Sequence, residues 1–471
     1  MRRLIALPAL ACALAVPEAA CAHAFAQRYD LPLPLWHYLA GAGATVALSF
    51  VIVAAAGTRA WPRMPRAAIA VPGAVARAAA AVMRLLGLAA FVVLLIAGVA
   101  GEQGDWDSNL LPVAVWVVWW VGLTFVCALV GDAWTLLDPW RTVAGWLARG
   151  ARRPRLRVQG GVGAWPAVVL FFAFSWAELV WTENAVPRKL AALIAAYSVL
   201  AWVGMSLFGA ARWRESFDPF ARFFALFARF APVAAAPTQG GATVIVRPFG
   251  AGLGGADPLS ASETAFVLLV LATVGFDGVA ETPFWEAVVG AAMAGLYAAG
   301  FVHAYGYVAA GSLIKTLGLA AAPCLLAAIY GAACAVVGRI AGERTGLVMR
   351  RFVLSLVPIA IAYHLSHYLS YLLIQGQAAL PLASDPFALG WDLLGTSGRE
   401  IDIGIVDMRF IWLSAVAAIV IGHVVGVVLA HAEAQRAYGS LALRSQLPMV
   451  ALMIGYTMLS LWILSQPIVS V

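Results

Sequence analysis

Residues 352–375 read FVLSLVPIAIAYHLSHYLSYLLIQ, an apolar run that contains His364 and His367. It is long enough to cross a bilayer, because about 20 apolar residues in a helix span roughly 30 Å of hydrocarbon. A second such run, residues 409–430 (RFIWLSAVAAIVIGHVVGVVLA), contains His423. Ionisable side chains at that depth are energetically expensive and usually mark a functional site. These three histidines are therefore the main functional signal in the sequence.

The composition places the chain among polytopic helical membrane proteins. Hydrophobic residues make up 63% of the chain and charged residues 11%, with a mean hydropathy of +0.89. Soluble domains carry about a quarter charged residues. The net charge of +7 comes mainly from arginines between the apolar runs. That pattern indicates inner loops that face anionic lipid, and it does not indicate a nucleic-acid partner. The five cysteines form no CxxC motif, which argues against a disulfide framework and c-type haem.

The N-terminus has the features of a cleaved secretory signal. Two arginines precede the apolar run LIALPALACALAV, and residues 20–22 (ACA) fit a small-residue cleavage site. The sequence therefore predicts a signal peptide over residues 1–22 and a single transmembrane domain over residues 23–471. Cleavage would leave His23 first in the mature chain, where its amine and imidazole could chelate a metal ion together. The alternative is that His23 simply follows the cleavage site.

The apolar runs predict an all-α fold with about ten transmembrane helices. The positive-inside rule places the arginine-rich loops on the cytoplasmic side and the acidic loop 102–109 outside. The chain is thus expected in a bacterial inner membrane, with both mature termini on the periplasmic side. The predicted inner loops are residues 58–78, 132–162, 212–262 and 339–351. The predicted spans are residues 36–57, 79–101, 110–131, 163–182, 190–211, 263–281, 314–338, 352–375, 410–432 and 447–469.

Several segments outside these spans have features of their own. The charge pattern leaves room for one span between residues 281 and 339, so residues 284–311 are expected to lie in or re-enter the outer interface. The sequence does not fix whether they cross. Residues 131–149 and 209–230 each contain Asp-Pro-aromatic followed by an aromatic face with arginines. They predict amphipathic helices in the cytoplasmic interface and hint at an internal duplication. Residues 237–262 have room for a small β-hairpin.

The polar residues of the spans predict a metal site in the outer half of the bundle. His364 and His367 are three residues apart, so both project from one helix face, a spacing that suits two ligands of one metal ion. With His423 as the third ligand, Asp277 in TVGFDGVAETPFW would be a fourth ligand or a base. Imidazole and carboxylate donors suit zinc, iron, manganese or copper.

Small residues accompany these candidates. Gly422 and Gly426 flank the third histidine in a GxxxG pattern, which admits a neighbouring helix closely. Gly278 and Pro283 follow Asp277 and are expected to break its helix near the outer end, where Asp277 could instead cap the helix.

The alternative for the histidines is a structural role, in which they hydrogen-bond nearby hydroxyl groups and hold helices together. The nearby hydroxyl residues are Tyr363, Ser366 and Tyr368. Glu178, in FSWAELVWTEN, is expected at the outer interface. His303 is likewise expected at the interface, and His37 in an aromatic belt with Trp36 and Tyr38.

Five blocks of sequence are distinctive in combination. They are A-H-x-F at residues 22–25, YDLPLPLWHYLAGAGA at 29–44, GFDGVAETPFW at 275–285, PIAIAYHLSHYLSYLLIQGQ at 358–377 and IGHVVGVVLAHAEA at 421–434. Together they resemble a bacterial family of integral membrane proteins known as fenitrothion hydrolases. Members usually have glycine where this chain has Ala24. The resemblance implies membrane-bound hydrolysis of an organophosphorus triester, with a second related membrane subunit as a partner.

The sequence thus predicts a membrane-embedded, metal-dependent hydrolase open to the periplasmic side and acting on small lipophilic substrates. A metal ion would activate water, and Asp277 would orient or deprotonate it. Three alternatives stay open: a metal or proton transporter, favoured by the expected helix break; a haem-binding electron carrier with His364 and His423 as axial ligands; and a partner subunit without catalysis.

Overall fold

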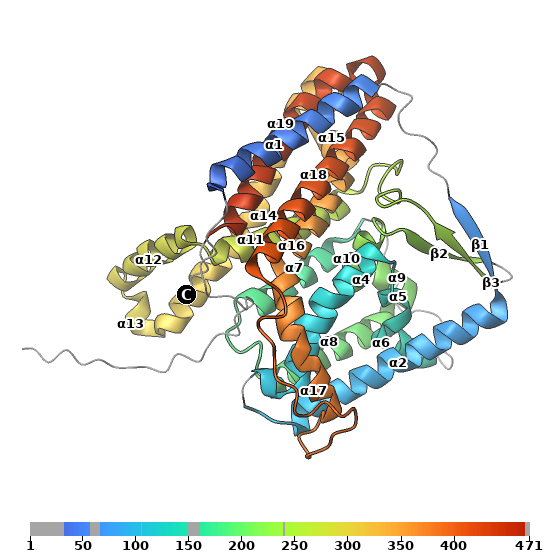
Figure 1. The fold of residues 1–471 in the computed structure, drawn as a ribbon, viewed down its shortest axis with the longest axis vertical. Helices are drawn as coiled ribbons and strands as arrows, with labels where there is room; N and C mark the ends of the chain where they lie inside the picture. Colours follow the sequence, from blue (N-terminus) through green and yellow to red (C-terminus); the bar gives the residue numbers. More distant parts are fainter. Residues whose placement is uncertain (1–32, 57–65, 105, 148–160, 239–240, 467–471) are drawn as a thin grey trace, which may run out of the picture.

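The structure is a computed structural model, and its described part is mostly helical (Figure 1). Eight helical stretches within it are long and apolar enough to cross a membrane. This confirms the prediction of a helical membrane protein. The described residues are 33–56, 66–104, 106–147, 161–238 and 241–466. The predicted signal peptide and His23 lie outside them.

The long helices form two groups that are joined by α11 and α16 (Figure 1). One group contains α1, α14, α18 and α19, and the other contains α2, α4 and α8 with shorter helices. Because α11 and α16 contact both groups, their side chains occupy the centre of the molecule. The bounds are α1 (Leu35–Ala56), α2 (Gly73–Ala100), α4 (Leu123–Leu129), α7 (Trp165–Leu179), α8 (Pro187–Phe208), α11 (Ala261–Ala280), α14 (Tyr307–Ala341), α15 (Thr345–Phe352), α16 (Val357–Gln375), α17 (Ala379–Ser384), α18 (Met408–Tyr438) and α19 (Ala442–Leu464).

The third apolar run is not a regular α-helix. It begins with α3 (Leu110–Pro112), continues as the π-helical stretch η2 (Val113–Gly122) and ends as α4. The wider turn is visible at its end, where the Leu123 amide donates to the carbonyl of Val118 five residues back. Such stretches are rare and often lie at functional sites. Here the stretch carries Trp120, which faces the polar centre described below.

A three-stranded antiparallel sheet connects two of the predicted inner loops. Its order is β1 (Ala67–Pro72), β3 (Gly241–Val246), β2 (Val233–Thr238). The prediction of a hairpin in the long loop is confirmed, although the hairpin begins at residue 233 rather than within 237–262. Strand β1 was not predicted. Its Pro72 is tolerated because β1 is an edge strand of this sheet.

Arginines connect the other predicted inner loops to the same face, which we call the arginine-rich side. Arg350 donates to the carbonyl of Leu259. Arg436 donates to the carbonyls of Gly255 and Ala256 at 3.2 and 2.7 Å. Together with the sheet, these contacts bring the loops around residues 67–72, 233–259 and 343–351 to one side of the bundle.

The two Asp-Pro segments form similar pairs of short helices. Asp138 lies between α5 (Trp134–Leu137) and α6 (Pro139–Leu147), and Asp218 lies between α9 (Ala210–Ser216) and α10 (Pro219–Ala228). The Asp218 carboxylate caps α10 by accepting the amides of residues 220 and 221 at 3.0 and 2.9 Å. Asp138 accepts the amide of residue 141 at 3.0 Å. Both carboxylates are buried.

Helix α10 packs inside the protein instead of lying in the lipid interface as predicted. Its Phe220, Phe223, Phe224 and Phe227 are all buried. They recur at helical spacing and form one apolar stripe. This stripe contacts α4 and α7, so the aromatic face that suggested a lipid surface is covered by other helices.

The buried pair Asp138 and Asp218 predicts a pH dependence of stability. Burial, and then the negative charge of Asp138, raise the pKa of the Asp218 carboxyl from 3.8 to about 7, although Arg214 nearby opposes this. Tyr197 also faces Asp218, with its hydroxyl at 3.5 Å. The folded protein keeps a proton that the unfolded chain releases near pH 4. Its stability should therefore fall between about pH 4 and about pH 7, by a few kcal/mol.

Asp218→Asn should remove much of that fall, because the amide oxygen can still cap α10 but carries no charge. Thermal unfolding of the detergent-solubilised protein near pH 5 and near pH 8 measures this loss of stability. The matched control is Asp407→Asn, since Asp407 caps α18 from an exposed position. Equal pH slopes for wild type and Asp218→Asn would contradict this assignment.

Helices α16 and α18 pack closely at the predicted GxxxG. A Cβ atom at Gly422 would collide with the Cβ of Ala362 and lie 2.7 Å from the Pro358 carbonyl oxygen. A Cβ at Gly426 would lie 2.8 Å from the Ser355 carbonyl oxygen. The two glycines therefore allow the backbones to approach, as this pattern predicted.

Residues 284–311 form short helices that branch away from the bundle (Figure 1). They are α12 (Pro283–Ala298), α13 (Phe301–Tyr305) and the start of α14. Helix α12 is too short to be among the candidate spans, and most of its side chains are exposed or half-buried. In the described part of the chain, the segment thus adds no candidate span before α14, and its position at the outer interface stays a prediction.

Candidate functional site

Asp277 of α11 and His367 of α16 form a buried hydrogen-bonded pair at the centre of the bundle. The Nε2 atom of His367 lies 2.8 Å from Oδ2 of Asp277. The hydroxyl of Tyr368 donates to the same oxygen at 2.6 Å. A ring nitrogen that faces a carboxylate carries the proton, so this contact orients His367 as a donor. The sequence placed Asp277 and His367 in one site, and the structure brings them together.

Helix α11 presents Asp277 from within its last turns. It starts at a capping box formed by Ser260 and Glu263 and runs to Ala280. The expected break near its outer end is present, because α11 ends at Ala280 and Pro283 begins α12, although Gly278 itself stays helical. The glycine serves packing, since a Cβ there would collide with the hydroxyl of Tyr363. Asp277 consequently does not cap the helix, and its carboxylate is available to side chains of α16.

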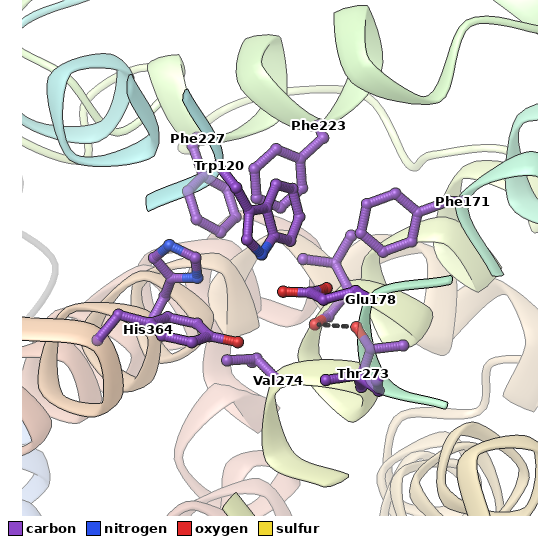
Figure 2. Close-up of a pocket in the computed structure, with 11 residues that line it drawn as sticks. Trp120, Phe171, Glu178, Phe223, Phe227, Thr273, Val274 and His364 are labelled. Carbon is purple, nitrogen blue, oxygen red and sulfur yellow. Dashed lines mark hydrogen bonds between the residues drawn. The ribbon is translucent and has the colours of Figure 1, made fainter. Parts of the chain in front are cut away.

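A narrow cavity adjoins this pair. It offers about 10 Å³ to a water molecule, roughly the space of one water. Aromatic rings form much of its wall (Figure 2). Figure 2 also shows the imidazole of His364 and the carboxylate of Glu178 directed into the same space, beside the indole nitrogen of Trp120. The aromatic wall consists of Trp120, Phe171, Phe223, Phe227 and Tyr368.

His364 has an unsatisfied nitrogen at this cavity. Its ring is buried among aromatic rings, with centroids 4.7 Å away at Tyr368 and 5.9 Å away at Trp120. Its Nε2 atom has no hydrogen-bond partner among the described residues. The nearby Ser366 hydroxyl donates to backbone carbonyls of α16 and α18 instead, so the predicted structural bond to that serine is not formed. Because an unpaired buried polar atom costs free energy, the nitrogen is suited to a water, a substrate or a metal ion.

Glu178 lines the cavity, in contrast to the interfacial position expected for it. Its carboxylate lies within electrostatic range of Asp277 and near the side chains of Trp120 and Tyr368. The indole nitrogen of Trp120 points toward it without an ordinary hydrogen bond. Helix α7, which ends at Leu179, packs against α11, and this contact places Glu178 beside α11. Two neighbouring carboxylates in a dry site repel each other unless a proton or a cation lies between them.

His423 has different surroundings from the other two histidines. Its Nδ1 lies 2.8 Å from the carbonyl oxygen of Ile419, and its ring centroid lies 6.1 Å from that of Tyr456. Its Nε2 is buried with no partner in the described part of the chain. The cavity is lined by His364 but not by His423. His367 does not line it either, but it bonds Asp277, and both lie within electrostatic range of His364, whereas His423 has a separate environment.

The remaining described histidines lie away from this centre. His37 stacks on Trp36 with ring centroids 3.6 Å apart, in an exposed position that fits an aromatic belt. His303 is exposed on α13 and contacts Tyr297. His431 bonds the side chains of Gln446 and Gln435 at 3.1 and 2.7 Å.

The types of donor atom near the cavity suit a divalent metal ion. The set combines the unpaired Nε2 of His364 and the carboxylate of Glu178, which line the cavity, with the carboxylate of Asp277, which lies behind the lining within electrostatic range of Glu178. Nitrogen and oxygen donors of this type are those of zinc, iron and manganese sites. In the described residues, however, no three His, Cys, Asp or Glu side chains are already arranged around one ion position. Binding would therefore require local rearrangement.

The aromatic wall was not predicted. Trp120 and Phe171 come from apolar runs in which nothing distinguishes them from lipid-facing residues. Phe223 and Phe227 belong to α10, whose spacing indicated a buried face but not what covers it. The sequence offered one usable signal for this wall, which is the helical spacing of Phe220, Phe223 and Phe227. The arginines of the segment fall between these positions, so they leave the apolar stripe intact.

The fold and the site together define a polytopic helical membrane protein with a buried histidine–carboxylate centre. Comparison of the chain with protein families, with curated proteins and with solved structures found no match. The resemblance to fenitrothion hydrolases accordingly stays a prediction.

Proposed function

We propose that the protein is a membrane-embedded, metal-dependent hydrolase whose reaction centre is the cavity beside Asp277. The observation that carries the proposal is a cavity lined by a free imidazole nitrogen and the carboxylate of Glu178, next to a histidine–aspartate pair that reaches it through Tyr368. Acids and bases poised in a water-excluded site are what hydrolysis requires.

Each residue has a distinct role in this proposal. His364, Glu178 and Asp277 would hold the divalent ion. When bound, the ion supplies Lewis acidity toward a phosphoryl oxygen and makes water easier to deprotonate. The Nε2 atom of His364 would supply the nitrogen ligand, because it has no hydrogen-bond partner among the described residues. His367 and Tyr368 hold the Asp277 carboxylate in place through their two hydrogen bonds.

An organophosphorus triester is the substrate class that the resemblance implies, and the aromatic wall is chemically suited to it. The cavity holds about one water, so a triester could enter only if aromatic side chains move aside. Phe223 and Phe227 of α10 line the cavity and are buried, so these side chains would have to move for a triester to enter. A lipophilic substrate would reach them from the bilayer.

We also propose ten spans in the bacterial inner membrane, with both mature termini on the periplasmic side. Two facts support the count: α18 and α19 share one 57-residue apolar stretch, and α7 is a shorter apolar helix within the bundle. Alkaline phosphatase fused within residues 387–407 should then be active. The same fusion at residues 239–240 should be inactive, and the reverse result would contradict this topology.

Metal content tests the proposed centre. Purified wild-type protein should retain about one divalent ion per chain, as measured by mass spectrometry. His364→Gln and Glu178→Gln should each lose it, together with hydrolysis of a chromogenic 4-nitrophenyl phosphate triester. His423→Gln is the matched control, because His423 is equally buried with a free Nε2 but lies outside the cavity.

The outcomes separate the hypotheses. If His423→Gln also loses the ion, the result would support the site predicted from the sequence, with His364, His367 and His423 as ligands. If folded wild-type protein contains no metal ion and hydrolyses no triester, the proposed enzymatic function is rejected.

A proton transporter is the second candidate, and one observation favours it. Polar side chains continue from Asp277 to the buried Tyr363 and the half-buried Tyr456, and the Tyr456 ring lies 6.1 Å from His423. Such a row is what proton relays in membranes use. Proteoliposomes with an internal pH dye would detect the flux, and a Tyr456→Phe variant should abolish it. A haem is less well supported, since His364 and His423 contact different side chains.

A further inference from the structure

A second and larger cavity lies on the arginine-rich side and shares no lining residue with the first. Its volume is about 320 Å³. It lies where α15 and α18 reach the loop around residues 251–256, beside the segment that leads into β1. Nothing in the proposed hydrolase or transporter uses it.

The polar lining of this cavity has an excess of positive charge. Arg66, Arg351 and Arg436 line it, against the single carboxylate of Glu433. That carboxylate is already shared, because it lies 3.3 Å from Arg351 and 2.9 Å from Arg436. The cavity therefore retains net positive charge after its internal ion pairs are counted.

The three arginines are not equivalent. Arg351 is largely buried and is held by Glu343 at 2.9 Å as well as by Glu433. Arg436 is fixed by Glu433 and by two backbone carbonyls. Arg66 has no hydrogen bond or ion pair to any described residue, and it lies close enough to Arg247 for their charges to repel. The first two form a fixed base, and Arg66 supplies a free guanidinium at the rim.

The rest of the lining is apolar. Leu253, Phe352, Leu354 and Leu429 contribute side chains to the wall. A site that combines guanidinium groups with an aliphatic wall matches a ligand with an anionic head and an apolar tail. Guanidinium groups prefer phosphate oxygens, which they bind through paired hydrogen bonds.

We propose that this cavity binds a phosphate group attached to an apolar tail, the chemistry of an anionic phospholipid headgroup. Arg66 closes on the phosphate, while Arg351 and Arg436 provide the positive floor. The inner leaflet is rich in such lipids, and basic pockets between helices on that side are suited to them. A free phosphate ester shares the head chemistry but lacks the tail.

Binding of phosphatidylglycerol to the detergent-purified full-length protein, measured by native mass spectrometry, tests the proposal. Phosphatidylglycerol should bind about tenfold more tightly than phosphatidylcholine. Arg66→Gln should remove most of that preference, because it deletes the free guanidinium and no internal ion pair. Arg344→Gln is the matched control, since Arg344 is exposed near the start of α15 but does not line the cavity.

Inorganic phosphate distinguishes the two sources of the head group. Failure of about 10 mM phosphate to displace the lipid supports a lipid site, since the tail then contributes to binding. Displacement that depends on Arg66 supports the phosphate site but assigns it to a soluble phosphate ester. Equal binding of both lipids, or equal weakening by Arg344→Gln and Arg66→Gln, overturns the proposal.

Discussion

Asp277→Ala is expected to have the largest effect of any single change at the centre of the bundle. It removes the shared acceptor of the His367 ring and the Tyr368 hydroxyl, and it leaves both donors buried without that partner. Hydrogen bonds between membrane helices contribute about 0.6–1.7 kcal/mol each, so the loss should be about 1–3 kcal/mol. Unfolding of the purified protein in mixed detergent measures this difference.

Asp277→Asn separates chemistry from stability. The amide oxygen can still accept one of the two hydrogen bonds, and the side-chain volume is unchanged. We therefore expect a variant nearly as stable as wild type that has lost its metal ion and about 100-fold or more of its hydrolytic rate. Asp407→Ala is the control for stability, because this exposed carboxylate only caps α18 and its loss should cost about 1 kcal/mol.

Two results would contradict this view of Asp277. One is an alanine variant as stable as wild type, which would mean that the three side chains do not form a buried network. The other is an asparagine variant with full metal content and activity, which would remove the carboxylate from the reaction centre. The hydrogen-bonded cluster would then be structural only.

Gly422→Ala should destabilise the protein by about 1–3 kcal/mol, although alanine is the best helix former. The added methyl group would collide with Ala362 and approach the Pro358 carbonyl oxygen to 2.7 Å. Because the neighbour is backbone and a short side chain, α16 and α18 must move apart. Gly422→Leu should prevent folding altogether. A shift of α16 would also misplace His364 and His367, so activity should fall with stability.

Gly455→Ala is the matched control for this prediction. Gly455 lies within α19, and a Cβ there would meet no atom within 4 Å. The same substitution should then be neutral or stabilising by up to about 1 kcal/mol. Equal effects at the two glycines would mean that close approach of α16 and α18 is not what Gly422 provides.

Particular residues show how far the sequence could lead. The apolar runs located the long helices, since length and composition alone indicate a span. The GxxxG at Gly422 correctly indicated a close contact, and Asp277 was correctly paired with a histidine of α16. These residues were informative because polar and very small side chains are unfavourable against lipid, so their positions mark contacts between helices.

Other features could not be predicted because their cause lies in tertiary packing. Glu178 was assigned to the interface by its position in the sequence, but the packing of α7 against α11 brings it near Asp277. His423 shares the depth expected for a ligand, but helix rotation directs it toward Tyr456. Strand β1 is a run of small apolar residues that forms a strand only because β3 lies beside it.

The pairing of β1 with β3 has a consequence for how the protein is made. Pro72 and Gly241 are partners, yet 169 positions of chain separate them. At about 5–20 residues per second, ribosomes need roughly 8–35 seconds to synthesise that stretch. The first strand must therefore wait unpaired while several helices insert, exposed to proteases and to other edges. Assembly of the sheet thus comes after insertion of the first half of the bundle and marks its completion.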